Sequence, residues 1–538
     1  MILSKRPATL AILLLLAALS LQSQAAVGGS NLVFYGLAAL ALIIFLFIVV
    51  SVSDNFMAIE QKQAGITDAN LAMFPRLGEI FRKKTPEYLD EAHVYTLKAG
   101  YDVPVEGDPV ATVIDAPGVN RYAIRPPDFR GPAPIPRVTV EVGDQVRAGD
   151  VVFHDKKQDR IKYCAPVSGE VIEVNRGLKR SIASIVILAD KEQQSRDYEL
   201  PAATATRGEL VDFLLESGVW PSIRQRPYNV VADPDLVPRD IFVSTFSTSP
   251  LAPNLALSVL GREDDFQAGL DVLNRLTDGL VYLGLDGNGE TASRFAAFRG
   301  VQQRYFRGKH PAGNVGTQIH HIHAAGAGDN TVWTLDVAGV LSLGKLFRTG
   351  VYDSSRVVAL GGYSLANPIH VRTHAGANLG ELLANQGVSD NDRVISGDVL
   401  SGTNVGHEGY LGYFDDQVSV IREGNEAEIF GWLLPIKPRA SVSPTIPVLS
   451  SEVEVTTNSH GERRAFVVNN DYEQVFPFDI YLQQLMKSII VNDFENMEGL
   501  GIYELVEEDV ALAEFACVSK QPLQQILRSG LDTMREQG

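Results

Sequence analysis

The first fifty-three residues contain two long apolar runs, and these constrain the chain more than any other feature. The first run, Ala8–Leu21, follows Lys5 and Arg6 and precedes the small residues of Ser23–Ala26. This order is typical of a secretory signal. The second run, Leu32–Val52, carries no charge and is long enough to cross a bilayer as a helix. We therefore predict that residues 1–26 form a signal peptide or first membrane segment, and that 31–53 form a transmembrane helix.

Counting the crossings predicts where the remaining chain lies. If the signal is cleaved, the single helix returns the chain to the cytoplasm; if it is not, the two segments form a hairpin with both ends inside. Lys62, Arg82, Lys83 and Lys84 follow the second run and agree with a cytoplasmic side. We expect an inner-membrane protein with a single-pass anchor, a linker over 54–92 and a large cytoplasmic part.

Charge and cysteine content exclude several classes of protein. The formal net charge is −18, which argues against binding along a nucleic-acid backbone. Cys164 and Cys517 are the two cysteines of the chain. Two cysteines cannot build a disulfide framework, a four-cysteine zinc site or an iron–sulfur cluster. The 538 residues predict three to four domains.

The segment Val138–Val174 alternates short β-rich runs with Gly-Asp turns, at Gly143-Asp144 and Gly149-Asp150. It resembles the barrel-sandwich fold of biotinyl and lipoyl domains, which predicts such a domain over residues 93–190. Gln158 stands where those domains carry their modified lysine. We therefore expect a carrier-type fold without a covalent cofactor.

The rest of the chain predicts an α+β multidomain protein. Helical patterns at 209–215 and 266–276 alternate with apolar strands at 229–232, 240–243 and 279–283, which favours a Rossmann-like α/β domain over residues 191–354. Residues 355–439 resemble a β-grasp ligand-binding module. A proline- and serine-containing linker is expected at 440–469, and helices at 470–538, where Ile480, Leu482, Leu485, Ile489 and Ile490 are apolar.

Several spaced segments together resemble one family, the NqrA subunit of the bacterial sodium-translocating NADH:quinone oxidoreductase (Nqr). The resemblance runs in one order from about residue 93 to the C-terminus. The segments that carry it are Asp155–Ile182, Lys309–Ile322, Gly344–Gly362, Asn367–Leu383 and Gly397–Gly424. The N-terminal membrane extension is a departure from the family.

This resemblance implies a function within a respiratory complex. That complex moves electrons from NADH to ubiquinone and exports Na⁺, using FAD, FMN, riboflavin and iron–sulfur clusters. The implied partners are NqrB, NqrC, NqrD, NqrE and NqrF, most directly NqrB. Redox relatives of the family bind a flavin phosphate at a glycine-rich loop, but here Gly218 is followed by Val219, Trp220 and Pro221. We therefore expect this chain to bind no redox cofactor and to be catalytic only within the complex.

Candidate binding residues are few. If the chain contacts quinone, the proline-rich segment is the candidate, through Phe129, Arg130, Gly131, Pro132 and Pro134. No catalytic or metal-binding residue is assigned.

Two other patterns are better explained by structure than by a site. His321 and His323 would share a face on a strand, but no carboxylate or cysteine nearby completes a metal site. The segment Gly284–Arg294 lacks the Gly-Lys-Ser/Thr of a phosphate loop.

Three other functions remain as alternatives. A membrane-fusion adaptor of a transport system also joins one helix to a barrel-sandwich domain, but it needs long heptad repeats that this chain lacks. A flavin-binding dehydrogenase component is disfavoured by the missing glycine loop, and a covalent carrier protein by Gln158.

Overall fold

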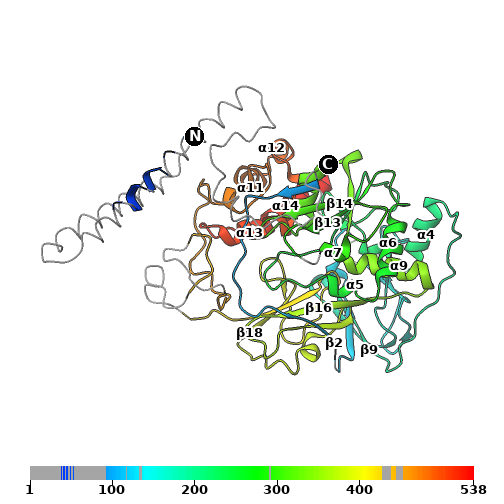
Figure 1. Cartoon of the computed structure of the whole chain (residues 1–538). Coiled ribbons are helices and arrows are strands. Elements are labelled where there is room, and N and C mark those ends of the chain that lie inside the picture. The colour runs from blue at the N-terminus through cyan, green and yellow to red at the C-terminus, as the bar shows by residue number, and fades with distance from the viewer. Residues whose placement is uncertain are drawn as a thin grey trace. The chain divides into compact units, whose positions relative to one another are not determined.

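The computed structural model describes residues 93–116, 118–131, 136–289, 292–426, 438–443 and 452–537, with a few residues between 38 and 53 (Figure 1). The chain divides into two compact units, Met1–Tyr88 and Leu89–Gly538, and the second contains every feature below. The predicted signal segment and the 54–92 linker lie outside the described residues, as does most of the predicted 31–53 helix. Within the described residues, no helix is long and apolar enough to cross a membrane.

The barrel-sandwich region consists of two small antiparallel sheets. Both predicted Gly-Asp turns are present: Gly143 and Gly149 have positive φ, and each following aspartate accepts a backbone N–H within its turn. The stacked rings of Phe153 and Tyr163 lie in its core. One sheet has the order β3 (Arg121–Ile124), β9 (Ile182–Ala189), β8 (Gly169–Arg176), β5 (Gln145–Val146), and the other β4 (Arg137–Val138), β6 (Val151–His154), β7 (Lys162–Cys164).

A seven-stranded sheet forms the α/β layer. Its middle strands read as nearly continuous apolar runs, as expected for parallel strands covered by helices on both faces. The order is β1 (Val94–Thr96), β14 (Gln302–Arg307), β13 (Val281–Asp286), β12 (Ile241–Ser244), β15 (Val332–Leu335), β10 (Arg224–Arg226), β11 (Val230–Val231). The first five are parallel, and β10 is antiparallel to both of its neighbours.

Six helices accompany this sheet within the described residues. Each predicted helix overlaps one of them: 209–215 overlaps α4, and 266–276 overlaps α6. Thr206 begins α4 with a capping box to Glu209. The helices are α4 (Arg207–Glu216), α5 (Ala256–Val259), α6 (Glu263–Leu273), α7 (Ala292–Phe295), α8 (Val315–His323) and α9 (Val337–Thr349).

A mixed six-stranded sheet follows in the chain. Its order is β19 (Thr403–Asn404), β18 (Asp392–Ser396), β20 (Gln417–Arg422), β16 (Ser355–Gly361), β17 (Ile369–His374), β2 (Val110–Asp115), with the short α10 (Leu379–Leu382). Its edge strand β2 comes from the predicted barrel region, and β1 of the same region pairs with β14. The first strands of that region therefore extend two other sheets.

Four helices end the chain: α11 (Leu482–Ile490), α12 (Phe494–Gly499), α13 (Glu507–Ala516) and α14 (Leu523–Gln537). They share a second hydrophobic core, separate from the main one. Of the apolar stripe noted in the sequence, Leu482, Leu485 and Ile489 are buried there, whereas Ile490 is exposed.

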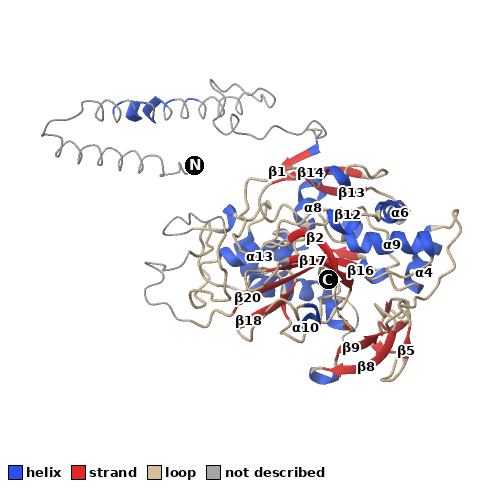
Figure 2. Cartoon of the chain, turned by 60° about the horizontal axis from the view of Figure 1, so that its bottom comes forward, coloured by secondary structure: helices blue, strands red, loops and turns tan. Residues whose placement is uncertain are grey.

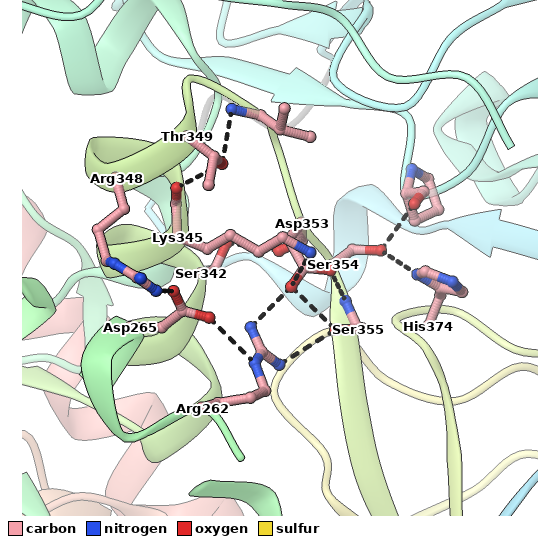
Figure 3. A network of polar contacts seen from close by, with 12 residues as sticks. Arg262, Asp265, Ser342, Lys345, Arg348, Thr349, Asp353, Ser354, Ser355 and His374 are labelled. Carbon is pink, nitrogen blue, oxygen red and sulfur yellow. Dashed lines mark hydrogen bonds and ion pairs between the residues drawn. The ribbon is translucent and has the colours of Figure 1, made fainter.

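The three layers meet at Asp353, just before β16 (Figure 3). Its carboxylate accepts hydrogen bonds from Arg262 beside α6 and lies 3.4 Å from Nζ of Lys345 on α9. The next residue, Ser354, donates to the carbonyl of Pro166 in the barrel and contacts Nδ1 of His374 on β17. One short segment therefore connects the α/β layer, the mixed sheet and the barrel.

Candidate functional site

A cavity of about 260 Å³ opens at the carboxyl ends of the parallel strands. Ser244 ends β12 and Asp336 follows β15, and both line it. Its other walls come from the segment between the end of β18 and the start of β19 (396–403), from residues 414–417 at the start of β20, and from Glu508 of α13. Ligands of α/β sheets commonly bind at this edge, which makes the cavity the candidate site.

Five carboxylates line the cavity. Four already accept hydrogen bonds from the protein: Asp336 from the N–H of Gly339 (2.6 Å), Asp398 from the N–H of Leu400 (2.6 Å), Asp415 from the hydroxyl of Ser396 (2.5 Å), and Glu508 from Arg226 (2.6 Å). Burial raises the pKa of Asp415. The fifth, Asp416, has its pKa raised to about 7, first by burial and then by the nearby Asp336. Asp416 can therefore take up or release a proton near neutral pH.

Two cationic or titratable groups oppose these acids. The guanidinium of Arg224 lies over the ring of Phe414, 4.8 Å from its centroid, and its buried Nε has no hydrogen-bond partner among the described residues. Buried His310 is within 3.3 Å of the Thr248 hydroxyl through Nδ1, and burial lowers its pKa. The cavity thus offers one donor at Arg224 and one proton-exchanging carboxyl at Asp416 to a small polar ligand.

Of the proline-rich segment predicted to contact quinone, the described residues Phe129, Arg130 and Gly131 do not line this cavity. Phe129 is buried among aromatic rings, 4.6 Å from the ring centroids of both Tyr163 and Tyr413. Arg130 forms an ion pair with Glu507, and burial lowers the pKa of Arg130 to about 10. The carbonyl of Gly131 accepts a hydrogen bond from Arg535 of α14. Pro132 and Pro134 lie outside the described residues.

Arg130 instead borders an open groove of about 590 Å³ against α14. The groove has mixed charge, since Arg130 and Arg528 line it together with Glu507 and Asp532. Among the described residues of the segment, Arg130 therefore borders this groove and not the strand-end cavity, while Ser401 lines both.

The predicted place of the lost flavin loop is filled by side chains. Gly218 follows α4 with φ of 71°, and a Cβ there would lie 2.1 Å from Sγ of Cys164. Trp220 is fully buried, packs edge-on against Trp333 and donates its indole N–H to the carbonyl of Ala232. These residues pack in the hydrophobic core of the domain.

The segment with the histidine pattern is helical, so the shared face that a strand would give His321 and His323 does not form. His320, His321 and His323 lie in α8, where residues two apart do not share a face. His320 binds Glu504 through Nδ1 at 2.7 Å. Within the described part of the chain, no group of three or more His, Cys, Asp or Glu residues is placed to hold a metal ion.

Sequence reasoning missed the cavity residues. Ser244 and Asp336 are polar residues placed at or directly after the ends of buried strands, and that signal could have identified them. Arg224, Asp398 and Asp416 come from elements far apart in the chain, so no local pattern identifies them.

These features define a multidomain α+β protein in which a barrel-sandwich domain and an α/β layer accompany a polar strand-end cavity. Three family models match it in order: the NqrA N-terminal barrel-sandwich hybrid domain at residues 95–190, the NqrA second alpha/beta domain at 205–352, and the NQRA C-terminal domain at 357–406. Two curated relatives are NqrA subunits of a Na(+)-translocating NADH-quinone reductase, from Shewanella frigidimarina and Vibrio atlanticus. Each is 38% identical over 450 residues, which cover 82% of this chain and all of the relative.

The chain belongs to the NqrA family of Na⁺-translocating NADH-quinone reductase subunits. Among solved structures, an NAD⁺-reducing [NiFe]-hydrogenase in its H₂-reduced state aligns at 13% identity with a TM-score of 0.26, over 34% of this chain and 40% of that one. A score this low carries no argument about fold or function.

Proposed function

We propose that this chain is the peripheral NqrA component of a membrane-bound complex that transfers electrons from NADH to quinone and exports Na⁺. The observation that carries this proposal is the identity to curated relatives over their whole length. The chain is enzymatic only as part of the complex. The family match does not favour the transport-adaptor alternative.

Several finer assignments belong to this proposal. The direct partner is the large membrane component NqrB, with NqrC, NqrD, NqrE and NqrF completing the complex at the inner membrane. The uncharged run at 32–52 supports a single-pass anchor with the large unit in the cytoplasm. The proposal includes the domain borders 93–190, 191–354, 355–439, 440–469 and 470–538, with a Rossmann-like second domain and a β-grasp third.

We propose that the chain holds no flavin or iron–sulfur cluster, and that FAD, FMN, riboflavin and the clusters reside in other subunits. Five carboxylates line the strand-end cavity, Asp336, Asp398, Asp415, Asp416 and Glu508, and they would repel a flavin phosphate. An absorbance scan of the purified chain near 450 nm tests this assignment. A stoichiometric flavin band would overturn it.

The quinone assignment stays with the segment that includes Arg130 and Gly131. The guanidinium of Arg130 borders an open groove and could donate a hydrogen bond to a quinone carbonyl. Arg130→Gln in the assembled complex should raise the KM for quinone several-fold and leave NADH oxidation with an artificial acceptor unchanged. Quinone addition should also slow hydrogen exchange at 128–136; unchanged exchange and KM would remove quinone from this segment.

Membership of the complex is tested by affinity purification of the chain from detergent-solubilised membranes. We expect five other subunits to co-purify with NADH:quinone reductase activity that Na⁺ stimulates. If the chain purifies alone, or with an outer-membrane channel, the assignment to this complex fails. The membrane-fusion adaptor of a transport system then becomes the favoured function.

A further inference from the structure

The β8–β9 hairpin projects from the barrel-sandwich region, away from the other sheets (Figure 2). Its tip is the 3₁₀ turn Leu178–Arg180, which joins the two strands after Gly177. Every residue from Arg176 to Arg180 is exposed. The tip therefore presents its side chains to whatever lies beyond this edge of the protein.

The tip has an unusual combination of side chains for this chain. Leu178 is 91% exposed, more than any other large apolar side chain in the described residues. Arg176, Lys179 and Arg180 surround it, and the turn contains no acidic residue. Three cations within five residues contrast with a chain whose net charge is −18.

These cations have no ion-pair partner among the residues that the structure describes. Among the described residues, the guanidinium of Arg176 donates one hydrogen bond, from Nη1 to the carbonyl oxygen of Arg180 at 3.5 Å. Lys179 and Arg180 both hold positive φ, 54° and 64°, a conformation that costs energy for residues with a side chain. The turn is closed by Ser181, which donates to the carbonyl of Leu178 through its hydroxyl and its N–H. The backbone thus fixes a turn whose side chains contribute nothing to the core.

We propose that this hairpin tip, Arg176–Arg180, contacts a membrane surface that contains anionic lipids, with Leu178 inserted among the headgroups and the three cations beside lipid phosphates. Each basic residue near an anionic surface contributes attraction, and a leucine gains by leaving water. An acidic protein surface with an apolar pocket would also receive these side chains, and the comparison of lipids below separates the two.

The contact is too small to hold a protein on a membrane by itself. Its effect arises when another attachment already keeps the protein close, because the second contact is then intramolecular. The hairpin would fix the orientation of the cytoplasmic unit. This inference goes beyond the proposed membership of the complex, since lipid contact at the tip can fail while the complex still forms.

The test uses the full chain reconstituted into vesicles, with Leu178→Cys labelled by the environment-sensitive dye NBD. The native Cys164 and Cys517 are buried, so the dye reacts with the introduced thiol. We expect NBD fluorescence to rise at least threefold, with a blue shift, in vesicles containing 30% phosphatidylglycerol compared with pure phosphatidylcholine. Brominated lipid should quench it.

Two comparisons decide the outcome. Adding Arg176→Gln, Lys179→Gln and Arg180→Gln should abolish the difference between the two lipids. A dye at Val237→Cys, an exposed position on another loop, should report no difference between them. Equal fluorescence at position 178 in both lipids overturns the proposal. A rise in NBD fluorescence at position 178 that appears only when the other subunits are added, and that does not depend on lipid charge, also overturns it. That result would identify a protein partner instead.

Discussion

Asp416 is buried and has a like-charged neighbour, Asp336, and both raise the pKa of its carboxyl. Its pKa is raised to about 7, while that of a carboxyl in the unfolded chain is near 4. Between these values the folded protein holds a proton that the unfolded chain has released. Stability therefore falls as the pH rises from about 4 to 7, and the destabilisation is complete above the folded pKa.

Asp416→Asn should remove this dependence. We expect its free energy of unfolding at pH 8 to exceed that of the wild type by roughly 2 kcal/mol, below the ~4 kcal/mol that the shift alone implies, because the cavity admits water. Denaturant unfolding between pH 4 and 8 measures it. Asp329→Asn, on an exposed turn, should keep the wild-type profile. Parallel curves for wild type and Asp416→Asn would contradict the raised pKa.

Gly218 and Gly261 form a matched pair at the residue scale. Both have positive φ, 71° and 76°, but a Cβ at Gly218 would strike Cys164, whereas nothing lies within 4 Å at Gly261. Gly218→Ala should cost about 2–4 kcal/mol of stability, and Gly261→Ala only about 1 kcal/mol. Chemical denaturation of both variants measures the difference. Equal losses of stability would show that backbone strain, and not the contact with Cys164, makes glycine necessary at position 218.

At the scale of elements, the start of α13 connects distant parts of the chain. Its first three residues are acidic, which suits a helix N-terminus. Glu508 and Asp509 accept hydrogen bonds from Arg226 of β10 at 2.6 and 2.8 Å, and Glu507 pairs with Arg130. This one helix end therefore holds the C-terminal helices against the α/β sheet and the proline-rich segment.

Arg226→Met should cost about 3–5 kcal/mol, because it leaves the buried carboxylate of Asp509 without its cation. Arg160→Met removes an exposed pair with Asp235 and should cost less than about 1 kcal/mol. Thermal unfolding of both variants measures the contrast. The double variant Arg226→Met, Asp509→Leu should recover part of the loss; no recovery would mean that the arginine acts through packing.

Local patterns predicted elements better than the contacts between them. The apolar run at 240–243 corresponds to β12 at 241–244, and the Gly-Asp turns of the barrel are present. These signals depend on burial and on turn geometry within a few residues. The pairing of Arg226 with Asp509 spans 283 positions, and the cavity draws on several separate segments. Periodicity carries no information on such distances, which also explains why the strand-end cavity was missed.

At the scale of the whole molecule, Asp353 is the joint between the barrel, the α/β layer and the mixed sheet (Figure 3). Burial would raise the pKa of Asp353, but Arg262 and Lys345 outweigh it, so the pKa is lowered. Its contribution to stability is thus present above pH ~4 and is lost as the pH falls through the lowered pKa.

Asp353→Ala should loosen this joint and cost about 3 kcal/mol, because Arg262 and Lys345 each lose a buried carboxylate partner. Hydrogen exchange should rise in α6, α9 and β16 together, and the acid limb of the stability profile should flatten. Asp115→Ala, which breaks an exposed 3.8 Å pair with Arg372, serves as the control. Faster exchange confined to one of the three elements would show that they do not share a joint.

The two strands that precede the barrel have a consequence for synthesis. Val94 pairs with Tyr305 and Val113 with His370, so β1 and β2 leave the ribosome more than 200 residues before their partners. At ~5–20 residues per second, these strands wait on the order of 10–50 s. During that interval chaperones must protect the unpaired strands of the nascent chain. The two sheets can be completed only after more than half of the chain has been synthesised.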